Sequence, residues 1–219
     1  MNSNIIIVED ACKEFKNHVL GLNNVNVAFE QGKIHGIIGR NGSGKTVLFK
    51  VICGFMKLSS GSVSVNGKIV GKDVDIPPNV GIIIEAPGFL PGYSGLANLK
   101  LLASLRHKIG IHRIRETMEI VGLDPSSSKK VRNYSLGMRQ RLGIAQAIME
   151  DPDILILDEP MNGLDLHGVD DVRKLLVNLK EQGKTILMAS HSREDIETLC
   201  DTVTEMDAGK LIGHSIHPA

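Results

Sequence analysis

The chain has 219 residues, of which 42% are hydrophobic, with 25 basic and 25 acidic side chains. This is the composition of a globular protein that can bury a core, and its balanced charge gives no general attraction to nucleic acid, so we expect no nucleic-acid partner. No apolar run approaches the roughly 20 residues that span a bilayer, and the polar start, Met1–Asn4, lacks the basic region of a signal peptide. Three widely separated cysteines fit reduced thiols. We therefore expect a cytoplasmic protein that reaches any membrane process through partners.

The first part of the chain is predicted to be mostly β structure. Short segments rich in β-branched residues alternate there with Asn, Gly and Gln. The pair Asn66-Gly67 predicts a tight hairpin, and an apolar run just before residue 85 has the character of a buried strand. The predicted strands are Ile5–Val8, Val25–Phe29, Ile34–Ile38, Ser62–Val65, Lys68–Val70 and Val80–Ile84.

The middle of the chain is predicted to be helical, because its apolar residues recur at helical spacing. The last third alternates strands with helices, which favours a mainly parallel sheet covered by helices. The predicted helices are Val47–Gly54, Gly95–Lys108, Arg113–Val121, Leu136–Glu150, Gly168–Glu181 and Glu194–Cys200, and the later strands are Ile154–Leu157, Thr185–Ala189, Val203–Met206 and Lys210–Ile212.

A glycine-rich segment between a predicted strand and a predicted helix fits the pattern G-x-x-x-x-G-K-[ST]. Its glycines let backbone N–H groups curl around phosphate oxygens, and the following helix adds its positive end. The lysine would reach the β- and γ-phosphates, and the threonine hydroxyl would bind Mg²⁺. The pattern alone predicts a nucleoside triphosphate site, shared by kinases, GTPases, helicases and motor ATPases. Its residues are Gly39, Arg40, Asn41, Gly42, Ser43, Gly44, Lys45 and Thr46.

Two adjacent acids, Asp158 and Glu159, end the apolar strand Ile154–Leu157. Neighbours on a strand point in opposite directions, yet at the carboxyl end of a parallel strand both can address the crevice where ligands bind. We expect Asp158 to bind Mg²⁺, directly or through water, and Glu159 to act as the general base or to position the attacking water.

Further short motifs follow in an order and at spacings typical of one family. A serine 23 residues before Asp158 opens a predicted helix, and a histidine follows the strand Thr185–Ala189. With these motifs the chain resembles an ABC transporter ATPase over essentially its whole length. The matching segments are the signature Ser135, Leu136, Gly137 and Met138, the D-loop Asn162, Gly163, Leu164 and Asp165, the switch histidine His191, and Phe15 at the position of an adenine-stacking aromatic.

The resemblance implies an α/β fold: a P-loop NTPase core with a mainly parallel sheet, an antiparallel β subdomain and an inserted helical subdomain. We expect one ABC ATPase domain over 1–219, with the helical subdomain at about 86–135 in a RecA-like core. The resemblance further implies that Lys45, Glu159 and His191 are catalytic, that Phe15 stacks on adenine, and that the signature contacts nucleotide held by another subunit.

Two departures from the family pattern stand out. The signature has Leu136 in place of its first glycine and Met138 in place of its glutamine. Glu85 stands where the family has the Q-loop glutamine, which keeps an oxygen for Mg²⁺ or water but loses an N–H donor. These departures are similar to those of the ATPases of bacitracin-resistance and lantibiotic-immunity exporters. We expect Glu85 to enter the nucleotide crevice as a third metal-site residue beside Thr46 and Asp158. We also expect it to couple the nucleotide state to the membrane subunit, as the glutamine does in relatives.

The resemblance implies ATP and Mg²⁺ as cofactors and two kinds of partner. One is a second ATPase subunit, either a second copy or a paralogue, and the other is a set of integral membrane permease subunits at the inner face of the cell membrane. The expected function is ATP-driven transport, with export of a peptide antibiotic or similar compound as the favoured direction. The alternatives are an ABC importer subunit, a non-transport ABC protein, and a P-loop kinase or GTPase. Phe89, Leu90 and Tyr93 are predicted either to pack in the helical subdomain or to form a docking surface.

Overall fold

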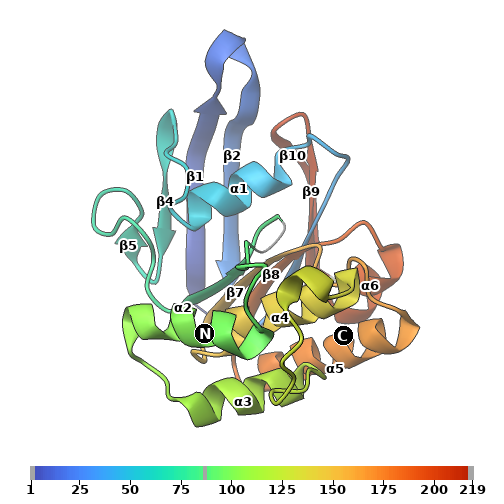
Figure 1. Ribbon diagram of the computed structural model, residues 1–219. Helices are drawn as coiled ribbons and strands as arrows, with labels where there is room; N and C mark the ends of the chain where they lie inside the picture. The colour runs from blue at the N-terminus through green and yellow to red at the C-terminus, as the bar shows by residue number, and fades with distance from the viewer. Residues whose placement is uncertain (1–2, 86–87, 217–219) are drawn as a thin grey trace.

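The computed structural model describes residues 3–85 and 88–216. Figure 1 shows a larger and a smaller β-sheet, with helices on both sides of the larger one. The predicted helical subdomain was placed to start at residue 86, so its first two residues lie outside the described residues.

The larger sheet has six strands in the order β10-β9-β3-β8-β7-β6. The five strands from β9 to β6 pair in parallel, and β10 closes the edge as an antiparallel hairpin with β9. The mainly parallel sheet predicted from sequence is therefore confirmed. Its strands are β3 (Ile34–Ile38), β6 (Val80–Ile83), β7 (Ile154–Asp158), β8 (Thr185–Ala189), β9 (Thr202–Asp207) and β10 (Lys210–Ile216).

The smaller sheet is antiparallel, in the order β2-β1-β4-β5, as the predicted β subdomain requires. Asn66 and Gly67 both have positive φ, of 52° and 72°, so the predicted hairpin turn is confirmed. The first two strands are longer than predicted, because pairing continues past irregularities in their register. The strands are β1 (Asn4–Glu14), β2 (Leu20–Glu30), β4 (Ser60–Val65) and β5 (Lys68–Ile69).

All six predicted helices are present, with ends shifted by a few residues. Ser94, Ser135, Asp165 and Ser192 each cap a helix, because their side-chain oxygens accept a hydrogen bond from a backbone N–H three residues on. The helices are α1 (Lys45–Ile52), α2 (Gly95–Arg106), α3 (Ile111–Ile120), α4 (Leu136–Ile148), α5 (Leu166–Glu181) and α6 (Arg193–Leu199), with short 3₁₀ turns at Lys16–His18 and Val131–Asn133.

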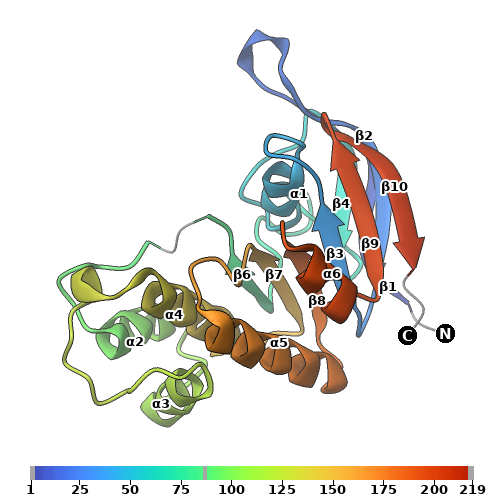
Figure 2. The ribbon, with the colours of Figure 1, turned by 90° about the vertical axis from the view of Figure 1, so that its right-hand side faces the viewer.

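The parallel sheet separates two hydrophobic cores. Ile154 and Ile156 of β7 face the core shared with α1 and the antiparallel sheet, whereas Leu155 and Leu157 face the core shared with the other helices. Successive strand residues point to opposite faces, so one apolar run supplies both cores. Figure 2 shows the resulting layers, with α1 beside the antiparallel sheet and the insertion of α2 and α3 standing to one side near α4.

The hydrophobic residues of the loop that leads into the helical insertion were predicted either to pack in the helical subdomain or to form a docking surface, and they differ in burial. Phe89 packs against the helical core, whereas Leu90 and Tyr93 are exposed, the latter by 58%. The three cysteines are free, in agreement with the prediction of reduced thiols. Within the described ranges, no helix has the length and apolar character needed to cross a bilayer.

Gly81 of β6 should be indispensable for packing α4 on the sheet. A Cβ at this position would press into the backbone carbonyl of Ala147 in α4, and backbone cannot move aside as a flexible side chain can. We expect Gly81→Ala to lower the free energy of unfolding by about 2 kcal/mol, measured by urea denaturation. The exposed Gly92 has nothing near its Cβ position, so Gly92→Ala should change stability by less than about 0.5 kcal/mol. Equal stability of the two variants would contradict this view of the packing.

Candidate active site

A cavity of about 620 Å³ lies at the carboxyl ends of β3 and β7 and beside the loop that follows β8. In open parallel sheets this edge is where ligands bind, because the connecting loops gather there. The cavity is lined by the glycine-rich loop, by the two acids at the end of β7, Asp158 and Glu159, and by His191. Sequence segments more than 100 residues apart are thereby brought to one site.

The glycine-rich loop connects β3 to α1 in a conformation that needs glycine. Gly39, Gly42 and Gly44 have φ values of 149°, 78° and 109°, which are unfavourable for other residues. A Cβ at Gly39 would also collide with the carbonyl of Met206 and the hydroxyl of Ser43. Glycine is therefore required at these positions for the loop to take this shape.

Lys45 and Ser43 turn this loop into an anion site. The Lys45 ammonium donates hydrogen bonds to the carbonyls of Gly39 (2.7 Å) and Arg40 (3.2 Å). These bonds hold its positive charge against the backbone of the loop. Ser43 is 3% exposed, and its hydroxyl has no hydrogen-bond partner among the described residues. A buried unpaired hydroxyl beside a buried ammonium suits a phosphate oxygen, which accepts hydrogen bonds from both.

Thr46 and Asp158 fit a magnesium ion. The Thr46 hydroxyl donates to Asp158 Oδ2 at 2.8 Å, so a hydroxyl and a carboxylate meet at the start of α1. Oxygen ligands of this kind, completed by water and phosphate oxygens, are what Mg²⁺ takes in nucleotide sites. Two of the three predicted metal-site residues are thus brought together at the cavity wall.

Glu159 and His191 face one another across the ends of β7 and β8. Glu159 has a φ of 53°, and its backbone N–H donates to the Ala189 carbonyl at 3.0 Å. His191 donates its backbone N–H to Glu159 Oε2, and its Nε2 lies 3.3 Å from Glu159 Oε1. Burial raises the pKa of Glu159, an effect that nearby His191 partly offsets. A carboxylate with a raised pKa is a stronger base, which suits removal of a proton from water.

Phe15 lines the same cavity, as do the apolar residues Val19 and Leu20. The ring is 38% exposed and lies over Gly21, where a Cβ would strike it. Lys13 Nζ is 5.6 Å from the ring centroid. A partly exposed ring in the cavity lining is available for stacking.

The signature and the D-loop of the same chain touch. The Ser135 hydroxyl accepts from the Met138 N–H and caps α4, while Leu136 lies against Gly163, where a Cβ would collide with the leucine side chain. Gly137 also approaches the Gly163 carbonyl. Leu136 and Asn162 line the cavity, whereas Leu164 packs partly against the helical core. The leucine that replaces the usual glycine therefore has a specific neighbour in this chain.

Glu85 reaches the cavity wall, but its carboxylate is already engaged. Glu85 Oε1 pairs with Lys50 Nζ of α1 at 2.6 Å, and the glutamate side chain is 64% exposed. Glu85 therefore lines the cavity as expected, with one carboxylate oxygen held by Lys50, and its part in the metal site stays a prediction. Lys50 was not singled out from the sequence, because a contact over 35 residues leaves no local pattern.

Gln140 is a site residue that sequence reasoning missed. Its side-chain amide donates to the carbonyls of Glu159 (3.2 Å) and Pro160 (2.9 Å), and it lines the cavity together with Arg139. Its position one helical turn after Leu136 was the available signal, because residues four apart share a helix face.

Comparison with known proteins agrees with this geometry. A model of the ABC transporter family matches residues 22–162. The chain is 44% identical over 190 residues to the uncharacterized ABC transporter ATP-binding protein YybJ of Bacillus subtilis, covering 87% of each chain. It is 39% identical to the bacitracin transport ATP-binding protein BcrA of Enterococcus faecalis, covering 95% of this chain and 68% of BcrA. A dimeric structure of the ATP-binding cassette MJ0796 with ADP and Pi has the same fold, with a TM-score of 0.89 at 20% identity, over 98% of this chain and 99% of that one.

Replacing Glu159 by glutamine should separate binding from hydrolysis. The amide keeps the shape of the side chain but cannot take up a proton, so we expect Glu159→Gln to bind ATP normally and to lose about 10²- to 10⁴-fold in kcat. Lys45→Ala removes the buried ammonium and should instead weaken ATP binding itself. ATPase assays and fluorescent-nucleotide titration measure the two effects. Near wild-type turnover in Glu159→Gln would exclude this residue as the base.

Proposed function

Because this chain belongs to the ABC transporter family as an ATP-hydrolysing subunit, we propose that it powers the export of a peptide antibiotic or a similar compound through separate membrane subunits. The observation that carries the export proposal is the likeness to a bacitracin transport ATP-binding protein over nearly the whole of this chain. The departures at Glu85, Leu136 and Met138 support the same branch of the family. We further propose that the protein acts on the cytoplasmic side of the membrane, attached through those subunits.

In the proposed mechanism, the glycine-rich loop and Lys45 hold the β- and γ-phosphates, and Phe15 stacks on the adenine. Thr46 and Asp158 would hold Mg²⁺, which when bound offsets phosphate charge. Glu159 takes a proton from the water that attacks the γ-phosphorus, while the bond to the ADP oxygen breaks. His191 Nε2 lies 3.3 Å from Glu159 Oε1, so the histidine would orient the γ-phosphate or the attacking water beside the base. Most of the rate enhancement then comes from positioning and charge.

We propose that two ATPase subunits close over two ATP molecules. The exposed start of α4, with Ser135 and Leu136, would contact the γ-phosphate bound by the partner, where a helix N-terminus with a hydroxyl favours an anion. Leu166, at the start of α5, is 88% exposed and offers apolar surface near the D-loop. A two-fold arrangement completes both sites at once, because each chain contributes one loop and one signature.

Glu85 is proposed to couple the nucleotide to the membrane subunits. Its ion pair with Lys50 supports this, because Lys50 belongs to the same helix that begins with the phosphate-binding Lys45. A shift of α1 on nucleotide binding would pull or release Glu85 and the chain that follows it. The exposed Leu90 and Tyr93 are suitable contacts for a membrane subunit.

Ser135→Ala should impair ATP-driven dimerisation and spare ATP binding by the monomer. The lost hydroxyl belongs to the surface proposed to face the partner, whereas the monomer's own phosphate loop is intact. Analytical ultracentrifugation in the Glu159→Gln background, with and without ATP, measures dimerisation without turnover. Normal ATP-driven dimerisation of the Ser135→Ala protein would contradict the two-chain site.

The export proposal is tested with the membrane subunits present. We expect co-expression of the chain with its membrane subunits to raise bacitracin resistance in a sensitive bacterium, and Glu159→Gln to abolish the gain. No gain in resistance from the intact complex would reject bacitracin as substrate.

Glu85→Gln keeps an oxygen that Lys50 can bind and should retain substantial transport. Glu85→Ala should lose more resistance than ATPase activity. Resistance equal to wild type in Glu85→Ala would show that Glu85 has no part in coupling.

A further inference from the structure

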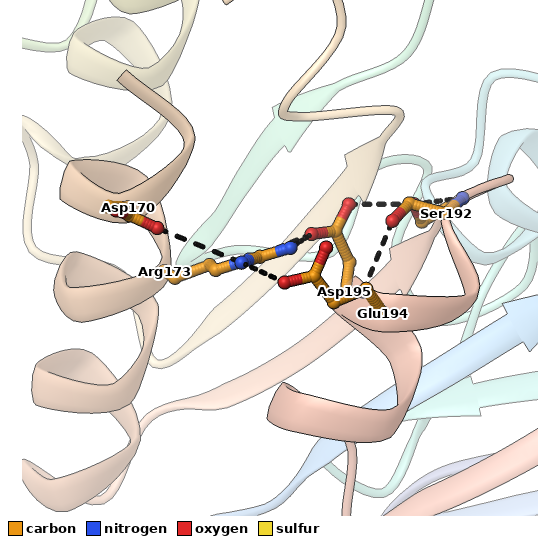
Figure 3. A network of polar contacts seen from close by, with 6 residues as sticks. Asp170, Arg173, Ser192, Glu194 and Asp195 are labelled. Carbon is orange, nitrogen blue, oxygen red and sulfur yellow. Dashed lines mark hydrogen bonds and ion pairs between the residues drawn. The ribbon is translucent and has the colours of Figure 1, made fainter. Parts of the chain in front are cut away.

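We infer that Asp195, anchored by Arg173, is a positioning residue for His191 and that this pair links the D-loop helix to the histidine. The inference rests on the role proposed above for His191 in ATP hydrolysis. Asp195 lies in α6, Arg173 lies in α5, and His191 stands in the short loop between β8 and α6. Figure 3 shows the polar network that joins these elements.

Asp195 is a buried carboxylate with both oxygens in use. It is 3% exposed, and its Oδ1 accepts hydrogen bonds from Arg173 Nε at 2.9 Å and Nη2 at 2.6 Å. A buried charge is tolerated only when it is paired, so the position of Asp195 depends on the guanidinium. Arg173 also pairs with Glu194 and Asp170, but these side chains are 74% and 59% exposed and hold it less firmly.

The other oxygen of Asp195 holds the loop that carries His191. Ser190, which precedes the histidine, is 6% exposed and donates its hydroxyl to Asp195 Oδ2 at 3.2 Å. The same hydroxyl accepts the N–H of Ser192, which follows the histidine, at 3.1 Å. The Ser190 hydroxyl therefore joins the residues on both sides of His191, and Asp195 holds this hydroxyl in place.

The histidine itself contacts the catalytic centre on the other side of this loop. Its backbone N–H and its ring both approach the carboxylate of Glu159. A chain of direct contacts thus runs from Arg173 through Asp195 and Ser190 to the peptide that presents the ring. A displacement of this loop by a fraction of an ångström would misplace His191 without touching the phosphate loop.

Arg173 also connects this chain of contacts to the D-loop. Asp165, the last D-loop residue, caps α5, and Arg173 lies about two turns further along the same helix. A movement of α5 when a partner subunit contacts the D-loop would pull on Asp195 and so on His191. In this way closure of the two subunits would set the histidine in place.

A plain structural tie between α5 and α6 would also explain an Arg–Asp pair, so the test needs a readout that stability alone does not change. Ser190→Ala removes the hydroxyl that joins Asp195 Oδ2 to the Ser192 N–H, and it leaves intact the Arg173–Asp195 pair and the hydrogen bond from the Asp195 N–H to Ser192 Oγ. Asp195→Asn keeps the shape of the side chain but removes its charge. Arg193→Gln is the matched control, because this exposed arginine of α6 pairs with Glu197 outside the network.

The full chain is assayed for kcat and KM with ATP, for melting temperature, and by NMR of the His191 imidazole. We expect Ser190→Ala and Asp195→Asn to lower kcat about tenfold or more with KM changed less than about twofold. The His191 signals should shift in both variants and stay unchanged in Arg193→Gln. Arg173→Gln should reproduce the loss of kcat, and Arg173→Lys, which keeps the charge, should restore part of it.

A comparison with His191→Ala separates this inference from the proposed function. If the network acts through the histidine, Ser190→Ala should lower kcat no further in a His191→Ala background. Loss of activity in His191→Ala with normal kcat in Ser190→Ala and Asp195→Asn would overturn the inference alone. Normal activity in His191→Ala itself would overturn both the inference and the role proposed for the histidine. A kcat that falls only as the melting temperature falls would identify a merely structural tie.

Discussion

The parallel pairing of β3, β8 and β7 is the constraint on which the site depends. Asp158 pairs with Ala189, and the hydrogen bond from the Glu159 N–H to the Ala189 carbonyl extends this pairing by one residue. Parallel strands end at the same edge of a sheet, so the phosphate loop, the two acids and His191 must meet there. The bond between Thr46 and Asp158 then joins α1 to β7 across that edge.

The two cores on opposite faces of the sheet place different parts of the site. Leu48, Phe49 and Ile52 anchor α1, and with it the phosphate loop, in the core shared with the antiparallel sheet. Leu142 and Ile144 anchor α4, and with it the signature, in the core on the other face. The cavity lies at the edge of the sheet that both cores share, so the phosphate loop is supported from one face and the signature from the other.

Two ion pairs link the cavity to its surroundings. Lys50–Glu85 joins the helix that begins at the phosphate loop to the end of β6, and Arg173–Asp195 joins the D-loop helix to the histidine loop. The first is well exposed and so contributes little to stability, which suits a contact that changes during a cycle. The second includes a buried carboxylate and is suited to holding a fixed geometry. This contrast in burial matches the roles proposed above, coupling for Glu85 and positioning for Asp195.

The sequence by itself determined where the six α-helices and the predicted strands lie, and it also identified the phosphate loop and the family. Each of these depends on apolar periodicity or on the spacing of residues within short motifs. The full length of β1 and β2, the pairing of Glu85 with Lys50 and the contact of Leu136 with Gly163 came only with the tertiary structure. Gln140 and the Arg173–Asp195 pair belong to the same group. The physical reason is distance along the chain, because Arg173 and Asp195 are 22 residues apart. The sequence does not show which of the 25 acidic residues pairs with Arg173, since packing of α5 against α6 decides it.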